Sequence, residues 1–194
     1  LEADDLSFFD VMLDQVAMDY QVDESRVYTM GVGSGGAASA FLTCQMPERF
    51  AAMANVQGYI DCAPSLPRPG LFMHGTGDPL IPEEGIPGIL PPFITGVNSW
   101  VQANACSMMP DSTIFPDLVT TDSSTVTLYE YPDCSNGSEV LYYRIEGGGR
   151  VTPGASNVPD AGPTNRDING DVEIWKFFNR QRLVTSTRVV PSPT

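Results

Sequence analysis

A glycine-rich turn after a short β-forming run is the part of the sequence most typical of a reactive site. Residues 26–31 read Arg-Val-Tyr-Thr-Met-Gly, and residues 31–36 read Gly-Val-Gly-Ser-Gly-Gly. Residues 37–44 are small and apolar, which favours a helix. A strand, a tight turn and a helix in this order predict either a phosphate-binding loop or a nucleophile elbow, which presents a reactive side chain on a sharp turn.

The residues around the turn argue against phosphate chemistry. A P-loop needs Lys followed by Ser or Thr after its last glycine, whereas Ala37 and Ala38 follow Gly36. A dinucleotide-binding turn needs an acidic residue about 20 positions further on, and residues 53–57 contain none. The elbow, and with it nucleophilic chemistry, is the remaining interpretation.

The elements that must position this turn alternate along the chain. Apolar residues recur at helical spacing from Leu6 to Tyr20, ahead of the turn. Further β-rich or apolar runs and amphipathic segments follow, separated by Pro- and Gly-rich loops at 79–92 and 147–167. We expect strands at 50–57, 70–74, 126–131 and 140–145, and helices at 97–106 and 171–182. This alternation predicts an α/β fold with a mostly parallel sheet flanked by helices.

Four blocks of the sequence resemble secreted α/β-hydrolases of the polyhydroxybutyrate depolymerase and feruloyl esterase type. The first runs from residue 26 through the turn to 52, and the second is His-Gly-Thr-Gly-Asp-Pro at 74–79. The third is Ile-Glu-Gly-Gly-Gly at 145–149, with Pro-Gly at 153–154, and the fourth is Asp-Ile-Asn at 167–169 leading into Ile-Trp-Lys-Phe-Phe at 174–178. The resemblance implies an α/β-hydrolase-like domain over residues 1–182, followed by a linker or tail at 183–194.

The resemblance also assigns a position to each member of the family's catalytic triad. The elbow pattern Gly-x-Ser-x-Gly falls on residues 31–35, so that Gly33 occupies the nucleophile position. The triad aspartate matches Asp78, and the triad histidine matches Arg150. Glycine has no hydroxyl group, and arginine cannot accept a proton near neutral pH because its pKa lies above about 12. The resemblance therefore predicts a degenerate site, with Arg150 either paired to Asp78 or turned to solvent.

Two residues are candidates for substitute roles. Ser34 follows the elbow apex and is the candidate nucleophile, although one step along a tight turn redirects a side chain. His74, the single histidine, is expected to be a hydrogen-bonded structural residue at a strand end rather than a displaced base.

Our leading interpretation is an extracellular pseudoenzyme with a binding or structural role, which could take a polysaccharide or polyester ligand. The alternative is an active serine esterase or depolymerase that cleaves polymer acyl esters with Ser34 and Asp78.

The cysteines and one glycosylation sequon favour an oxidising compartment. The four cysteines lack the C-x-x-C spacing of a zinc site. Residues 165–176 resemble a calcium loop but end on Lys176, where such a loop needs glutamate. We therefore expect no bound metal and no other cofactor. Asn136 begins an Asn-Gly-Ser sequon and is a glycosylation candidate. We expect a secreted protein. The hydrolase layout implies two disulfides, Cys44 with Cys62 and Cys106 with Cys134.

The charge and hydropathy of the chain limit the classes of partner that we expect it to bind. The 194 residues carry 24 Asp and Glu against 10 Lys and Arg, a net charge of −14, which excludes nucleic acid as the expected partner. Apolar runs are interrupted well before the roughly 18 residues that a membrane-spanning helix needs. The resemblance implies that the usual strands before the first helix are lacking. We therefore expect an upstream part of the same precursor, or a neighbouring subunit, to complete the sheet beside residues 27–30.

Overall fold

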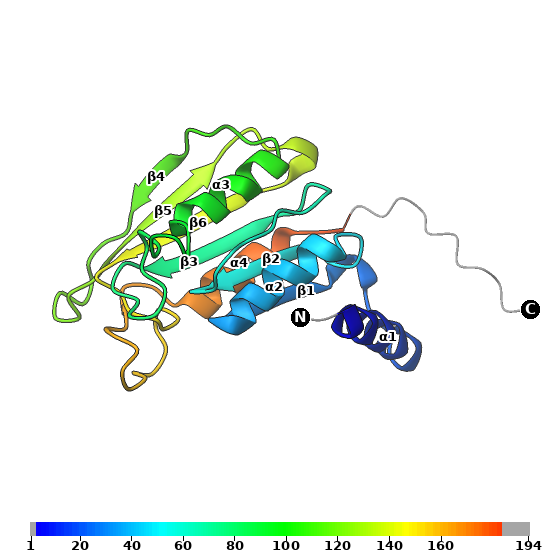
Figure 1. The fold of residues 1–194 in the computed structure, drawn as a ribbon, viewed down its shortest axis with the longest axis horizontal. Coiled ribbons are helices and arrows are strands. Elements are labelled where there is room, and N and C mark those ends of the chain that lie inside the picture. The colour runs from blue at the N-terminus through cyan, green and yellow to red at the C-terminus, as the bar shows by residue number, and fades with distance from the viewer. Residues whose placement is uncertain (1–2, 184–194) are drawn as a thin grey trace, which may run out of the picture.

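The computed structural model describes residues 3–183 and has a six-stranded, mostly parallel sheet at its centre (Figure 1). The strands lie in the order β1-β2-β3-β6-β5-β4. β1, β2, β3 and β6 are parallel, whereas β5 is antiparallel to both β6 and β4. In chain order, the strands are β1 Tyr28–Val32, β2 Ala52–Val56, β3 Gly70–Gly75, β4 Asp111–Ile114, β5 Thr125–Tyr131 and β6 Val140–Glu146.

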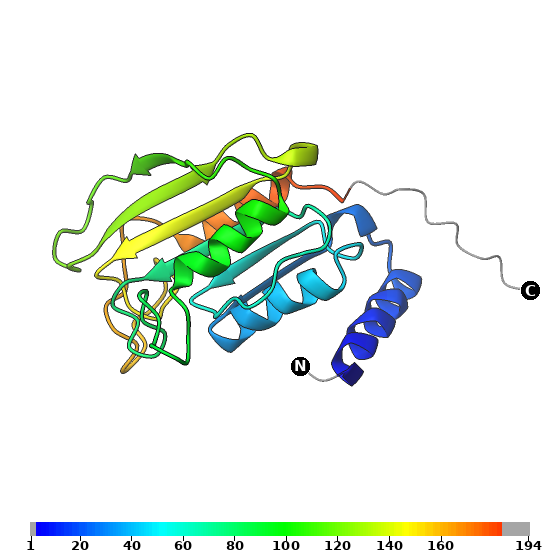
Figure 2. The same ribbon diagram turned by 45° about the horizontal axis from the view of Figure 1, so that its top comes forward.

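Helices cover both faces of the sheet. α2 (Ser34–Gln45) and α3 (Phe93–Ala103) lie on one face, and α4 (Gly170–Arg180) lies on the other (Figure 2). α1 (Ala3–Asp19) lies beyond β1, at the edge of the molecule (Figure 1). The predicted α/β-hydrolase-like architecture is confirmed. No helix among residues 3–183 is long and apolar enough to cross a membrane.

Alternation along the strands builds one core on each face. On β6, Leu141, Tyr143 and Ile145 join the cluster under α4, whereas Val140 and Tyr142 join the cluster under α3. β2 and β3 are buried along their whole length, as expected for central strands of a parallel sheet. The site loops at the ends of these strands therefore rest on a rigid base.

Several predicted boundaries were wrong. α3 begins at Phe93, four residues before the predicted start, and β4 lies in a segment for which we predicted no regular structure. All four residues of β4 are exposed, so no alternation of apolar and polar residues marks it in the sequence. The face predicted for the first helix is also too long, because Val16 and Tyr20 are exposed while Leu13 packs against the body.

Both predicted disulfides are confirmed. Cys44, near the end of α2, is bonded to Cys62, and Cys106, just after α3, is bonded to Cys134. The first bond ties α2 to the loop before β3, and the second ties the segment after α3 to the loop between β5 and β6. Residues 3–183 include no free cysteine. The predicted linker or tail at 183–194 lies, apart from Leu183, outside the described residues.

Candidate functional site

The turn between β1 and α2 has the backbone geometry of a sharp elbow. Gly33 is buried and has φ 60° and ψ −122°, a conformation that residues with a side chain rarely adopt. A Cβ atom at Gly31 would collide with the backbone of Gly35, so the two ends of the turn approach too closely for any other residue. The sequence thus builds the sharp turn but places no side chain at its apex.

Arg150 lies over this apex and is paired with Asp78. Its Nη1 atom is 3.1 Å from Oδ2 of Asp78 and 3.3 Å from the carbonyl oxygen of Gln57. Its Nη2 atom lies 2.6 Å from the position that a Cβ atom at Gly33 would occupy. Of the two alternatives left open by the sequence, the structure therefore has the ion pair and not an arginine turned to solvent.

The Asp78 carboxyl group is fixed on both oxygens by its surroundings. Its side chain is fully buried, and its Oδ1 atom accepts hydrogen bonds from the backbone N–H groups of Leu80 and Ile81 at 2.8 and 3.0 Å. The Arg150 guanidinium satisfies the other oxygen. Three donors thus engage both oxygens of this buried carboxylate, and the cation at Oδ2 is an arginine in place of the histidine that a triad aspartate orients.

The loop that carries Arg150 is fixed by backbone hydrogen bonds. Arg150 N–H donates to the carbonyl of Ala161, and Gly149 N–H donates to the carbonyl of Pro163 at 2.5 and 2.7 Å respectively. On its other side, Gly77 N–H donates to the carbonyl of Gly148 at 2.8 Å. These bonds keep the guanidinium over Gly33.

Gln57 is a site residue that the sequence reasoning missed. It follows β2, is fully buried, and has a positive φ of 58°. Its amide nitrogen donates to the Gly149 carbonyl at 2.7 Å, and its amide oxygen accepts from Gly75 N–H at 3.0 Å. Gln57 thereby joins the ends of β2 and β3 to the loop of Arg150. The sequence feature that could have indicated Gln57 is its position as a polar residue directly after an apolar strand.

Ser34 has no base beside it. It is the first residue of α2 and is exposed. Within residues 3–183, no side chain forms a hydrogen bond with its hydroxyl group. A serine hydroxyl needs such a partner to lose its proton during attack, so the described residues supply no activation for Ser34.

His74 lies near the end of β3, as predicted, but it does not have the hydrogen bond that we predicted. The ring is fully buried in β3 and stacks on Phe93 with centroids 4.1 Å apart. Neither ring nitrogen makes a hydrogen bond of normal geometry among the described residues, although the backbone of Ile81 lies close enough to favour the protonated ring. Burial, which disfavours the imidazolium, lowers the pKa of His74 to about 4 against the opposing charges of Asp78 and Glu83. The ring is therefore neutral at physiological pH and enclosed in the core.

The remaining candidates lie away from this cluster. Asn136 is exposed, in a short 3-10 turn between β5 and β6, so its position is compatible with glycosylation, which stays a prediction. In place of a calcium site, Asn169 caps α4 by accepting a hydrogen bond from Val172 N–H at 3.0 Å. Residues 3–183 contain no group of three potential metal ligands.

The chain is similar in sequence to several known esterases. The chain is 24% identical over 179 residues to a bifunctional acetylxylan esterase/xylanase of Neocallimastix patriciarum, covering 91% of this chain and 23% of that protein. It is 27% identical over 181 residues to feruloyl esterase C of Emericella nidulans, covering 90% and 57%. It is also 27% identical over 166 residues to feruloyl esterase B of Piromyces equi, covering 77% and 29%.

These similarities, at 24–27% identity, support a relationship between the chain and esterases. The chain spans between about a quarter and just over half of the length of these relatives. No family model matches it.

Proposed function

We propose that this chain is an extracellular domain of esterase descent that does not hydrolyse esters and instead has a binding or structural role. The observation that carries the proposal is the Arg150–Asp78 ion pair, which covers an elbow whose apex is glycine. Hydrolysis by an elbow serine needs a hydroxyl group, a proton acceptor and a group that orients the acceptor. A guanidinium group has no acceptor for a proton, and that of Arg150 occupies the space above Gly33, so it supplies no base and obstructs the nucleophile position.

The two disulfides support an extracellular location, because such bonds persist in oxidising compartments. The ligand class follows from the relatives, whose names refer to acetylxylan and feruloyl esters. We therefore propose a polysaccharide of the xylan type as the first ligand to test, with a polyester as the comparison. Cosedimentation with insoluble xylan and with polyhydroxybutyrate particles measures this directly. If the protein sediments with neither polymer, a structural role is the interpretation that remains.

The absence of hydrolysis is tested with a short chromogenic ester such as p-nitrophenyl acetate. We expect turnover at the solvent background for the wild type and for Ser34→Ala. Ser99→Ala, which changes a serine on α3 away from the elbow, is the matched control. Turnover well above background that disappears in Ser34→Ala but persists in Ser99→Ala would overturn the proposal and establish a serine esterase.

We propose further that a strand from an upstream part of the same precursor pairs with the side of β1 that has no strand partner among residues 3–183. β1 has β2 as its neighbour on one side, and Met30 and Val32 are 52% and 44% exposed. A strand edge with exposed apolar side chains favours pairing with another strand. A neighbouring subunit is the other source of such a strand, and the mass of the native assembly distinguishes the two.

A further inference from the structure

A hollow among the described residues lies at the opposite end of the sheet from Gly33. Its volume is about 940 Å³, and it extends between α1, the segments that precede β1, β2 and β3, and the segment after α4. Because these strands are parallel, their starts share one edge of the sheet, and their ends share the edge with Arg150. This groove, lined in part by Leu13, Val27, Leu66 and Pro69, is therefore separate from the elbow site.

The wall of the groove is apolar but its charged residues are mainly basic. Leu66, Val16 and Val22 line it and remain 40% or more exposed. The chain has a net charge of −14, yet four of its ten basic residues line the groove: Arg49, Arg68, Arg180 and Arg182. Two acidic residues, Glu24 and Glu48, also line it. The groove therefore carries a cluster of arginines although the protein as a whole is negatively charged.

Two of the four arginines are already neutralised. Arg49 contacts Asp10 and Asp14 of α1 at 3.3 and 2.7 Å, and Arg180 contacts Glu139 at 2.6 Å. These ion pairs fix α1 and α4 at the sides of the groove. The charge available to a ligand therefore comes from the other two arginines.

Arg68 and Arg182 are held by carbonyl groups rather than by carboxylates. Arg68 donates from Nε to the Pro47 carbonyl and from Nη1 to the Pro67 carbonyl at 2.6 Å. Arg182 donates from Nη1 to the carbonyls of Asn179 and Gln181. Within residues 3–183, neither guanidinium has an ion-pair partner, and neither Nη2 atom has an acceptor. Among the described residues, each guanidinium thus makes its hydrogen bonds to neutral groups and keeps its Nη2 donor for a ligand, while the charges of Glu48 and Asp23 act on Arg68 and Arg182, respectively, without an ion pair.

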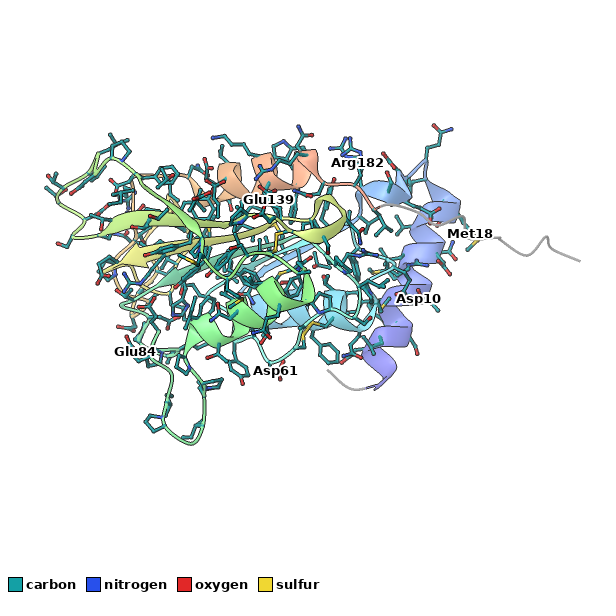
Figure 3. All side chains as sticks on the ribbon, turned by 90° about the horizontal axis from the view of Figure 1, so that it is seen from above. Asp10, Met18, Asp61, Glu84, Glu139 and Arg182 are labelled. Carbon is teal, nitrogen blue, oxygen red and sulfur yellow. A yellow bond between two sulfur atoms is a disulfide. The ribbon has the colours of Figure 1, made fainter. Side chains whose placement is uncertain are left out.

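Burial supports this assignment for Arg68. Removal from water lowers the pKa of Arg68, and the charge of Glu48 opposes that effect only in part. An arginine in this state gains stability from an added anion. Arg182 is exposed and lies beyond the end of α4, toward the end of the molecule where α1 carries Asp10 and Met18 (Figure 3).

From this geometry we propose that the groove binds an amphipathic carboxylate, with the apolar body against Leu66, Val16 and Val22 and the carboxylate on Arg68 and Arg182. The volume lies within the range of about 300–1,000 Å³ that is usual for small-ligand sites. A neutral chain of the same length would lose the charge-assisted hydrogen bonds, and a small anion would lose the apolar contact. The proposal does not depend on the elbow site.

Calorimetric titration of the full chain with octanoate tests the proposal, with octanol and acetate as the neutral and the small-anion comparisons. We expect octanoate to bind at least about tenfold more tightly than either. Arg68→Gln and Arg182→Gln should each weaken octanoate binding by about tenfold and leave octanol binding unchanged. Arg166→Gln is the matched control, because Arg166 lies outside this groove and contacts Asn157.

Several outcomes would overturn this assignment. Equal binding of octanoate and octanol would show an apolar surface without anion recognition. Octanoate binding that both groove variants leave intact, in proteins whose thermal unfolding matches that of the wild type, would place the anion elsewhere. Concentration-dependent dimerisation abolished by Leu66→Asp would show that a second copy of the chain fills the groove instead, and no octanoate binding would show that the groove is not a carboxylate site.

Discussion

Mild acid should destabilise this protein through His74. The imidazole is fully buried against Phe93, and burial lowers its pKa from 6.5 to about 4. The negative charges of Asp78 and Glu83 favour the protonated form, and the charge of Arg150 disfavours it, but burial outweighs both. In the unfolded chain the same imidazole is hydrated and takes up its proton at an ordinary pKa.

The sign and size of the effect follow from proton linkage. Between pH 6.5 and about pH 4, the unfolded state binds a proton at His74 that the folded state does not. The free energy of unfolding therefore falls as the pH is lowered through this window and is fully retained above it. The expected contribution of His74 is a loss of about 2 kcal/mol by about pH 5 and about 3 kcal/mol by about pH 4.

Urea unfolding of the wild type and of His74→Leu isolates this contribution. The carboxylates titrate in both proteins, and any packing cost of the leucine is independent of pH, so only the change in their difference with pH reports on His74. We expect the variant to gain about 2 kcal/mol relative to the wild type between about pH 7.5 and pH 5. A difference that stays constant over this range would refute a neutral, desolvated His74.

Three further outcomes are expected. Arg150→Met should lower the free energy of unfolding by about 3 kcal/mol in urea titrations, because Asp78 would remain buried without its cation; a loss below about 0.5 kcal/mol would contradict the ion pair. Replacing Cys106 and Cys134 together by serine should cost about 3 kcal/mol in calorimetric unfolding, given their separation of 28 residues, and an unchanged transition would be the contrary result. Met30→Lys should reduce self-association in sedimentation velocity if β1 pairs through its open edge; equal association in both proteins would exclude that edge.

Local patterns predicted the fold where burial was one-sided or complete. The strands at 70–75 and 140–146 were found within a few residues because each is a short, nearly continuous apolar run, and the last helix was found because its apolar residues repeat at helical spacing. β4 was missed because its side chains are all exposed and its pairing with β5 depends on a distant part of the chain. Period-based reasoning has no access to such backbone pairing.

For the candidate site, the sequence located the turn but not the contacts that close it. The positions of Gly33, Asp78 and Arg150 followed from resemblance to a family, and the ion pair was one of two alternatives. Gln57 was not considered, since its role arises only when the ends of three strands meet. His74 was expected to be hydrogen-bonded, and its solitary burial is visible only in the packing of Phe93 against it.

The position of the Arg150 guanidinium above the elbow constrains the order in which mutations can accumulate. Gly33→Ser alone would meet Nη2 of Arg150 and adopt a strained backbone, at a cost of about 1–3 kcal/mol. Arg150→His alone would leave Asp78 without its guanidinium partner. Each single substitution is thus unfavourable while the other residue is unchanged, whereas the double change relieves the clash. Stability therefore couples the two positions, because either substitution costs less once the other has been made.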